Sequence, residues 1–445
     1  MRKFFYVLLV LFISSEIFAH EAIVSYQLQQ NLNEASNESS GIGNWVSFDF
    51  HTGKAVKKVD TYLDGAVRFF HGTDDYMYSV SEVYFTAADS GREKVLSVGR
   101  KVVDWNMYEK FWGMNNINPQ RSFDLLDTHQ EGLTGIHYDH RFTKNISASV
   151  IFSYLYIPQL NPSLDIKDGK ITTPAQWYVL PPTKTRIKGQ DVPIHYQVDS
   201  PSVTDVVFQK TMGLDLSYRW DGGFFSTYGL FKPENELRIN AFGFYDQDVE
   251  KVVVKAQPVV NYHSVYGFLT GHDFGFMKNN IGVEVIDPNA SMISELQWLD
   301  PLDVKPSKRT FNSEYFSIEP SYVKETYFHY GADFQLLGMN VNAGYIKLLS
   351  KETAVGDDFG SDPAKWKSAF GVGADYNLTD HFRLHVKWQY DFSREDNILK
   401  GELGHTYKFL NVAIGAELLG SPRKESFWCK YRTNDLVYTR LGYVF

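Results

Sequence analysis

Residues 381–392 read HFRLHVKWQYDF and alternate without a break between two kinds of side chain. The apolar members are Phe382, Leu384, Val386, Trp388, Tyr390 and Phe392, and the polar members are His381, Arg383, His385, Lys387, Gln389 and Asp391. Successive side chains of a strand point to opposite faces, so this period of two predicts a β-strand. Its length exceeds the roughly five or six residues of an average strand and suits a tilted bilayer crossing of about 9–11 residues.

Neighbouring and distant segments repeat this alternation. Residues 365–376 alternate in the same way, and residues 377–380 (NLTD) have the composition of a turn between two strands. Further alternating runs occupy residues 146–156, 212–220 and 410–418. Aromatic residues recur at the ends of these runs, which is typical of strands that meet a membrane interface.

Long polar segments separate the alternating runs, at 106–131, 158–204, 288–313 and 351–363. Short turns on one side and long loops on the other predict an all-β fold, a transmembrane antiparallel up-and-down β-barrel. Division of about half of the mature chain by about 11 residues per strand gives about 18 strands, with a range of 16–20. Residues 20–445 are predicted to form this single outer-membrane barrel domain.

The N-terminus predicts export. Met1, Arg2 and Lys3 are followed by an apolar run at 4–13 and by Ala19 at a cleavage position, the order of a secretory signal peptide, which we assign to residues 1–19. The apolar run has about half of the roughly 20 residues that a spanning helix needs. No later apolar stretch approaches about 18 residues.

The composition excludes some classes of protein. Aromatic residues make up 16% of the chain, which fits the aromatic girdles of a barrel but also a large soluble β-protein. The formal net charge of -9 argues against nucleic acid as a partner. The chain has one cysteine, Cys429, which cannot form an internal disulfide.

The last strand carries the most specific signal. Val437, Thr439, Leu441, Tyr443 and Phe445 lie on one face, and the chain ends on the aromatic residue. This segment resembles the C-terminal signature of bacterial outer-membrane β-barrel proteins. The resemblance implies a Gram-negative outer membrane, contact with its lipid and lipopolysaccharide, and an assembly signal (Leu441, Tyr443 and Phe445) that the barrel-assembly machinery reads. It leaves a homotrimer open.

A second resemblance covers about twenty residues. Residues 99–105 (GRKVVDW) and 116–119 (NINP) are similar to a Gly-Arg-Gln, hydrophobic, Trp-Gly pattern before an Asn-Pro loop in alginate-export-like and related porin families. Lys101 replaces the usual Gln and Asn106 the usual Gly. The resemblance bears on the early part of the barrel and not on a substrate.

The polar faces of residues 365–391 are rich in cations. A charge that faces lipid near the midplane costs about 2–4 kcal/mol, so these side chains are expected to face the lumen or lie near its rims. The pore-lining candidates are Lys365, Lys367, His381, Arg383, His385 and Lys387, with Arg219 and Asp215 from the run at 212–220. A basic pore wall attracts anions. The alternative is that acids of other strands, such as Asp215, Asp64 and Glu417, neutralise the stripe.

The loop at 106–131 is unusually aromatic for a segment that meets only water. We interpret it as a constriction loop that folds into the lumen, with Trp112 and Arg121 at the narrow point and Tyr108 nearby. Aromatic rings there favour sugar-like solutes. The alternative is that the loop packs against the outer rim.

Catalytic motifs are not evident. The chain has no Gly-x-Ser-x-Gly elbow, His-Glu-x-x-His motif or phosphate-binding loop, so we predict no enzyme activity, cofactor or metal. The predicted function is a porin-like channel for passive diffusion of small hydrophilic solutes, either anionic or saccharide. Two alternatives stay open: a non-conducting structural barrel whose loops bind polysaccharide or a partner, and an outer-membrane barrel hydrolase.

Overall fold

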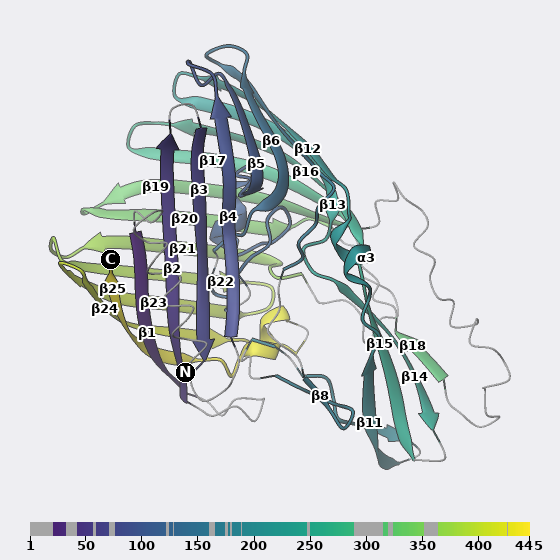
Figure 1. Cartoon of the computed structure of the whole chain (residues 1–445). Coiled ribbons are helices and arrows are strands. Elements are labelled where there is room, and N and C mark those ends of the chain that lie inside the picture. Colours follow the sequence, from purple (N-terminus) through teal and green to yellow (C-terminus); the bar gives the residue numbers. More distant parts are fainter. Residues whose placement is uncertain are drawn as a thin grey trace.

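The computed structural model describes residues 21–32, 42–56, 59–70, 76–121, 124–127, 129–159, 165–173, 177–178, 180–187, 189–246, 250–288, 315–318, 324–350, 364–424 and 426–445. Its largest sheet has 18 strands (Figure 1). In order they are β1 (Glu21–Asn31), β2 (Ile42–Val56), β3 (Val59–Phe70), β4 (Tyr76–Ala88), β5 (Lys94–Lys101), β6 (Leu133–Arg141), β7 (Ile146–Ser153), β12 (Thr211–Trp220), β13 (Gly223–Pro233), β16 (Tyr262–Asp273), β17 (Met277–Asp287), β19 (Glu325–Leu336), β20 (Met339–Leu348), β21 (Ser368–Asn377), β22 (Phe382–Asp391), β23 (Asp396–Tyr407), β24 (Leu410–Gly420) and β25 (Leu436–Val444).

The first and last strands close this sheet into a barrel. β1 pairs with β2 on one side and antiparallel with β25 on the other, where Tyr26 lies opposite Leu441 and Ser25 opposite Gly442. A closed sheet presents no unpaired edge to lipid, which is the condition for crossing a bilayer with strands. The predicted all-β, up-and-down barrel of about 18 strands is therefore confirmed.

The outer surface of the barrel is apolar. The outward side chains of β23, β24 and β25 include Leu403, Ile414 and Leu441, which are 40%, 61% and 48% exposed. On β24, the inward neighbours of Ile414 are the small residues Ala413 and Gly415. An apolar band facing lipid and smaller or polar residues facing the lumen are the pattern of a transmembrane barrel. The chain is an outer-membrane protein, as predicted.

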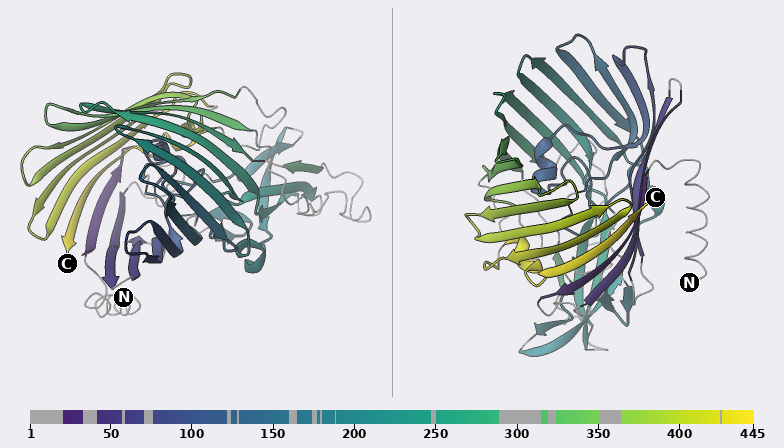
Figure 2. Two further views of the ribbon diagram at one scale, coloured as in Figure 1. Left: turned by 90° about the horizontal axis from the view of Figure 1, so that it is seen from above. Right: turned by 90° about the vertical axis from the view of Figure 1, so that its left-hand side faces the viewer.

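The two ends of the barrel differ in their connections (Figure 2). At one end the turns are short: Leu337 and Gly338 alone join β19 to β20, and their φ angles of 52° and 80° are those of a tight hairpin turn, for which glycine is well suited. The terminal Phe445 also lies at this end, where its backbone N–H donates to the carbonyl of Ala22 (2.8 Å). Short turns face the periplasm in bacterial barrels, and long loops face outward.

The long connections build a second sheet beyond the barrel mouth (Figure 1). Its strands are β10 (Lys184–Ile187), β11 (Gln190–Val198), β15 (Lys251–Val259), β14 (Arg238–Asp246) and β18 (Tyr315–Ile318), and the hairpin of β8 (Asp165–Lys167) and β9 (Lys170–Thr172) lies close to β11. The polar segment predicted at 158–204 contains β11, so the prediction of a loop was wrong for this strand. Val192, Ile194 and Tyr196 alternate there and pack against Val252 and Val254 of β15.

Three of the predicted segments lie wholly or almost wholly outside the described residues. The predicted signal peptide at 1–19 and the predicted loop at 351–363 lie outside the described residues, as does the predicted loop at 288–313 apart from Pro288. The described helices are short: α2 (Met107–Trp112), α3 (Val203–Val207) and the 3-10 helix η3 (Phe427–Tyr431). Within the described part of the chain, no helix has the length and apolar character to span a membrane.

A charge on the outer face is expected to destabilise the barrel. Leu403→Arg places a cation on the lipid-facing side of β23, at a cost of about 2–4 kcal/mol if it lies near the midplane. Thr406→Arg is the control on the same strand, because Thr406 lies opposite Asn411 on the lumen side. Unfolding by denaturant in phospholipid vesicles measures both. Equal stability of the two variants would contradict the assignment of the two faces.

Candidate channel lumen

The connection between β5 and β6 folds into the barrel. We call residues 102–132 the inner loop; the structure describes it except for residues 122, 123 and 128. The loop contains α2, which lies within the ring of barrel strands (Figure 2). Tyr108, Trp112 and Ile117 of the loop are at most 3% exposed and belong to the main buried cluster of the protein.

An ion pair fixes the two ends of the inner loop. Arg100 donates to the carboxylate of Glu131 (2.9 Å), and both side chains are 6% exposed. Ser79 donates to the other oxygen of Glu131 (2.5 Å), and Arg100 also donates to the carbonyls of Gly132 (2.9 Å) and Val80 (2.8 Å). A buried charge is tolerated where it is paired and its remaining polar atoms are bonded, as they are here.

The GRKVVDW and NINP segments meet at a neck in the inner loop. Asn118 accepts a hydrogen bond from the Val103 N–H (3.0 Å) and donates to the Val103 carbonyl (2.9 Å). Glu82 of β4 accepts from the Val102 N–H (2.8 Å). These segments therefore hold the base of the inner loop, a contact that their sequence did not indicate.

Local polar contacts shape the helix of the loop. Asn106 caps α2 by accepting from the Tyr108 N–H (2.9 Å), and Gly113 ends the helix in the left-handed conformation with φ 61°. The buried carboxylate of Glu109 accepts from the N–H groups of Ile117 (2.5 Å) and Asn118 (3.3 Å). The chain after α2 is thus bonded back onto the helix.

A row of glycines on the wall lets α2 approach the backbone. Gly331, Gly344 and Gly371 lie directly opposite one another on β19, β20 and β21. A Cβ atom would lie 3.2 Å from Tyr108 at Gly331, 2.8 Å from Phe111 at Gly344 and 3.0 Å from Phe111 at Gly371. We call these three residues the glycine row. Small inward residues on β21 were visible in the sequence, but their alignment across three strands was not.

The wall also binds the polar groups of the inner loop. Glu284 of β17 is 1% exposed and accepts from Asn106 (2.6 Å) and Asn116 (2.8 Å) of the loop and from the Tyr228 hydroxyl (2.6 Å). This carboxylate was not among the candidates from sequence, because its partners come from distant positions in the chain.

Two of the predicted pore-lining lysines contact the end of α2. Lys387 donates to the Phe111 carbonyl (2.6 Å), and Lys365 donates to the Gly113 carbonyl (2.5 Å). Gln389 also donates to the Phe111 carbonyl (3.1 Å). The last carbonyls of a helix have no partner within it, so ammonium groups are favourable there.

The other candidates of the basic stripe are placed differently. Asp375 pairs with Arg383 (2.7 Å) and with His385 (3.1 Å), near the short-turn end. Lys367 and His381 are exposed. Of the acids expected to neutralise the stripe, Glu417 pairs with Lys400 instead (2.6 Å).

The candidate constriction residues lie against different parts of the wall. Trp112 packs edge-on against Trp366 at a centroid distance of 5.4 Å, and Tyr108 stacks on His329 of β19 at 4.7 Å. Arg121 instead donates to Ser81 of β4 (3.1 Å). The structure therefore does not bring Trp112 and Arg121 to one point, and the inner loop reaches from the β19–β22 wall to the β2–β4 wall.

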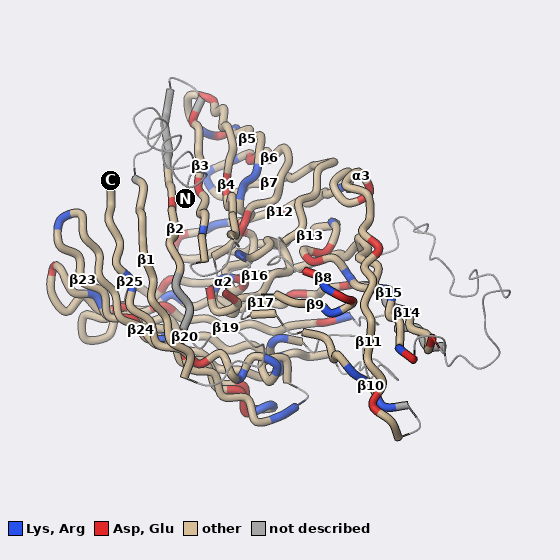
Figure 3. The backbone as a smooth tube through the Cα atoms, turned by 60° about the horizontal axis from the view of Figure 1, so that its bottom comes forward, with Lys and Arg blue, Asp and Glu red and all other residues tan. Residues whose placement is uncertain are grey.

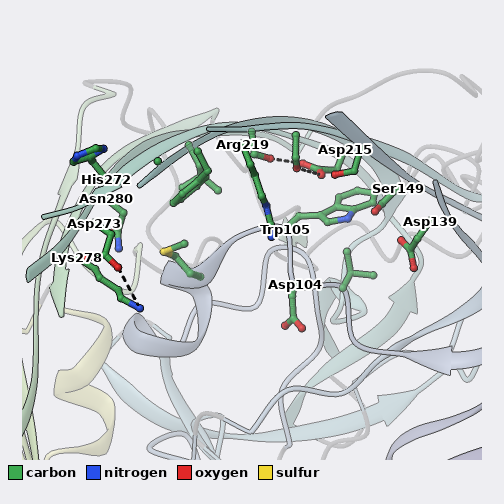
Figure 4. Close-up of a pocket in the computed structure, with 18 of the residues that line it drawn as sticks. Asp104, Trp105, Asp139, Ser149, Asp215, Arg219, His272, Asp273, Lys278 and Asn280 are labelled. Atoms are coloured by element: carbon green, nitrogen blue, oxygen red, sulfur yellow. Dashed lines mark hydrogen bonds and ion pairs between the residues drawn. The ribbon is translucent and has the colours of Figure 1, made fainter. Parts of the chain in front are cut away.

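A cavity of about 590 Å³ remains beside the inner loop, which we call the vestibule (Figure 4). It lies between one continuous stretch of wall (β5–β7, β12, β13, β16, β17 and β19) and residues 102–105 and 107 of the inner loop. Its charged and histidine lining residues are Lys101, Asp104, His137, Asp139, Asp215, Arg219, His272, Asp273, Lys278 and Asp333. Figure 3 shows acidic and basic residues interspersed along the strands in this part of the barrel.

A side chain in the glycine row is expected to displace the inner loop. Gly344→Val would place its Cβ 2.8 Å from Phe111, and overpacking of this kind costs about 1–3 kcal/mol. Gly401→Val is the matched control, because a Cβ there has no neighbour within 4 Å. Hydrogen–deuterium exchange of residues 107–113 should quicken about tenfold in Gly344→Val and stay unchanged in the control. Unchanged exchange in Gly344→Val would refute the docking of α2 on this row.

Glu109 is expected to make stability depend on pH. Burial and the negative charge of Glu284 raise the pKa of Glu109 from 4.5 to about 8. The folded protein then holds a proton that the unfolded chain releases, so the contribution of Glu109 to stability is largest below pH 4.5 and is lost as pH rises to about 8. The thermal midpoint of the wild type should drop more between pH 5.5 and 8.5 than that of Glu109→Gln. Parallel curves for the two proteins would contradict this assignment.

The comparisons with known proteins add a weak likeness in fold. The chain matches no protein-family model and no curated protein. Among solved structures, Acinetobacter baumannii OccAB4 aligns over 96% of this chain and 97% of its own, with 9% identity and a TM-score of 0.44. A mutant of Rh. blastica porin (96% and 99% covered, TM-score 0.39) and Salmonella typhi OmpF in complex with daunomycin (96% and 96% covered, TM-score 0.42) are also 9% identical. These scores are too low to carry an argument, so the porin-like barrel stands on this chain's own strand pairing.

Proposed function

We propose that the protein is a channel for passive diffusion of small hydrophilic solutes across the outer membrane. The observation that carries this proposal is the vestibule, a cavity of about 590 Å³ beside the inner loop with charged side chains in its lining. A closed barrel filled throughout by side chains would have no such space. Selectivity would come from the width left by the inner loop and from the charges that line it.

The mechanism needs no moving part. The inner loop is held at its base by Arg100 and Glu131 and along its length by Glu284, so it narrows the lumen as a fixed element. A solute would exchange part of its hydration shell for polar groups of the wall as it passes. We keep the predicted constriction role for the inner loop, with Tyr108 and Trp112 as its anchors and not as residues that meet the solute.

The contacts of the basic side chains weigh against the preference for anions that their sequence pattern favoured. Lys365 and Lys387 are engaged by helix carbonyls, and Arg383 and His385 share Asp375. These contacts weigh against a continuous basic wall and favour the alternative, a stripe with local partners. Passage of saccharides stays a prediction, as do a homotrimer, contact with lipopolysaccharide and recognition of Leu441, Tyr443 and Phe445 by the assembly machinery.

Single-channel recording tests the channel and the role of its inner loop together. Because Val103 and Asn118 are hydrogen-bonded to each other, residues 105–116 can be replaced by Gly-Gly without opening the neck. In planar bilayers we expect discrete current steps from the wild type and larger steps from this variant, because the loop occupies part of the lumen.

The control removes the same number of residues outside the barrel. Phe242 and Lys255 pair across the β14–β15 hairpin, so residues 243–254 can also be replaced by Gly-Gly. This variant should keep the wild-type conductance. An absence of current steps from the folded wild type would overturn the channel and favour the structural barrel, and release of fatty acid or cleaved peptide in a hydrolysis assay would favour the hydrolase.

A further inference from the structure

A group of serines lies on one part of the vestibule wall. Ser147 and Ser149 belong to β7, and the antiparallel register places Ser217 of β12 opposite Ser147. Ser226 of β13 lies in turn opposite Ser217. Neighbouring strands are about 4.8 Å apart, so the hydroxyls of these three strands cover a strip about 10 Å wide. All four residues line the cavity, and we call them the serine patch.

Two aspartates border the serine patch in the same register. Ser149 lies between Asp139 of β6 and Asp215 of β12. Asp215 is 6% exposed and accepts hydrogen bonds from two hydroxyls of the patch, and Asp139 pairs with Lys101 (3.1 Å). A carboxylate can accept about four hydrogen bonds. Both carboxylates are thus held in place and keep acceptor sites for the hydroxyl groups of a solute.

Unused hydrogen-bond donors lie among these acceptors. Arg219 lies on β12, on the same face as Asp215, and lines the same cavity. Within the described residues, its guanidinium and the hydroxyls of the two β7 serines form no hydrogen bond. The charges of Lys101 and Arg219 balance those of the two aspartates. This part of the wall therefore offers many hydrogen bonds and no net charge.

An indole ring lies beside the serine patch. Trp105 of the inner loop packs on Gly213 of β12, where a Cβ atom would lie 2.9 Å from two carbons of its ring. Gly213 stands two residues before Asp215, on the same face of the strand. The ring also lies 6.1 Å from that of Tyr228, which pairs with Asp215 across β12 and β13. The indole is half-buried, and in Figure 4 it borders the same part of the cavity as Ser149 and Asp215.

We propose that the vestibule binds an uncharged polyhydroxylated solute, a monosaccharide in its ring form, against the serine patch and Trp105. This inference rests on the proposed channel function and names its solute class. A sugar ring has hydroxyls around its rim and an apolar face of C–H groups. Its hydroxyls would donate to Asp139 and Asp215 and accept from Arg219, and its C–H face would pack on the indole. An ionic solute gains no net attraction from a wall whose charges cancel.

The test compares two uncharged probes of similar mass. D-Glucose has a ring of hydroxyls, whereas tetraethylene glycol is a flexible chain of ether oxygens with hydroxyls only at its ends. Each is added separately to single channels in KCl. Glucose should reduce the current in a saturable way at millimolar concentration. Tetraethylene glycol should reduce the current only in proportion to its concentration, through viscosity and occupied volume.

Two variants remove the recognition groups separately. Asp215→Asn should raise the glucose concentration for half-maximal reduction by at least about tenfold, because it replaces a charged hydrogen-bond acceptor by a neutral one. Trp105→Leu keeps an apolar side chain over Gly213 and removes the aromatic face. It should raise the half-maximal concentration by about fivefold.

Asp396→Asn is the matched control. Asp396 is also a buried acid that accepts hydrogen bonds from two serines, and it does not line the vestibule. This variant should leave the half-maximal glucose concentration unchanged. The site would be overturned by a wild type that treats glucose and tetraethylene glycol alike, by an unchanged value in Asp215→Asn or Trp105→Leu, or by an equal rise in the control.

Saturation-transfer NMR separates this inference from the channel itself. The protein is kept in a detergent without a sugar headgroup, such as dodecyldimethylamine oxide, and D-glucose is the ligand observed. If no current is seen, transfer to the C–H protons of glucose that both variants reduce would support the site in a barrel that does not conduct. Absence of transfer from the wild type would reject the site even where current steps are recorded.

Discussion

The pairing of β1 with β25 is the contact on which the rest of the structure depends. Backbone N–H and C=O groups cannot stay unpaired in hydrocarbon, so a sheet that crosses a membrane must close on itself. Here closure joins residues near the two ends of the described chain, and nine pairs from Ile23–Val444 to Asn31–Leu436 make the seam. Closure also creates an interior, and every charged side chain of the strands then has either the lumen or a rim to face.

The interior imposes a second condition, which the inner loop meets with polar contacts. A loop placed inside a barrel brings its own backbone groups out of water, and each one needs a partner. Glu109 and Asn118 supply partners for backbone groups within the loop, and Lys365 and Lys387 supply them from the wall side. Glu284 accepts from two side-chain amides of the loop. The glycine row removes the side chains that would keep these groups apart. Packing and hydrogen bonding therefore specify the same position for α2.

The sequence predicted the features that depend on one strand or one hairpin. The alternation at 381–392 correctly predicted β22, because period two is a local property. The number of strands followed from the chain length and the length of one bilayer crossing. Other features depend on how separate segments are placed against one another, which the pattern of a single segment does not determine. These are the glycine row, the contacts of Glu284 and the neck at Asn118. Inward-facing glycines at matching positions of three neighbouring strands are the signal in the sequence that could have revealed where α2 packs.

The basic stripe shows why charge on a strand does not by itself give selectivity. Six cationic or histidine side chains were assigned to one stretch of the wall from their spacing, and the spacing did place Arg383, His385 and Lys387 on the inward face of β22. The effect of these cations on a solute depends on which carbonyl and carboxylate groups lie close enough to bind them. Lys387 and Lys365 donate to carbonyls at the end of α2. Asp375 pairs with both Arg383 and His385. The field that a solute meets is therefore set by the charges left without partners, and not by the number of cations on one strand.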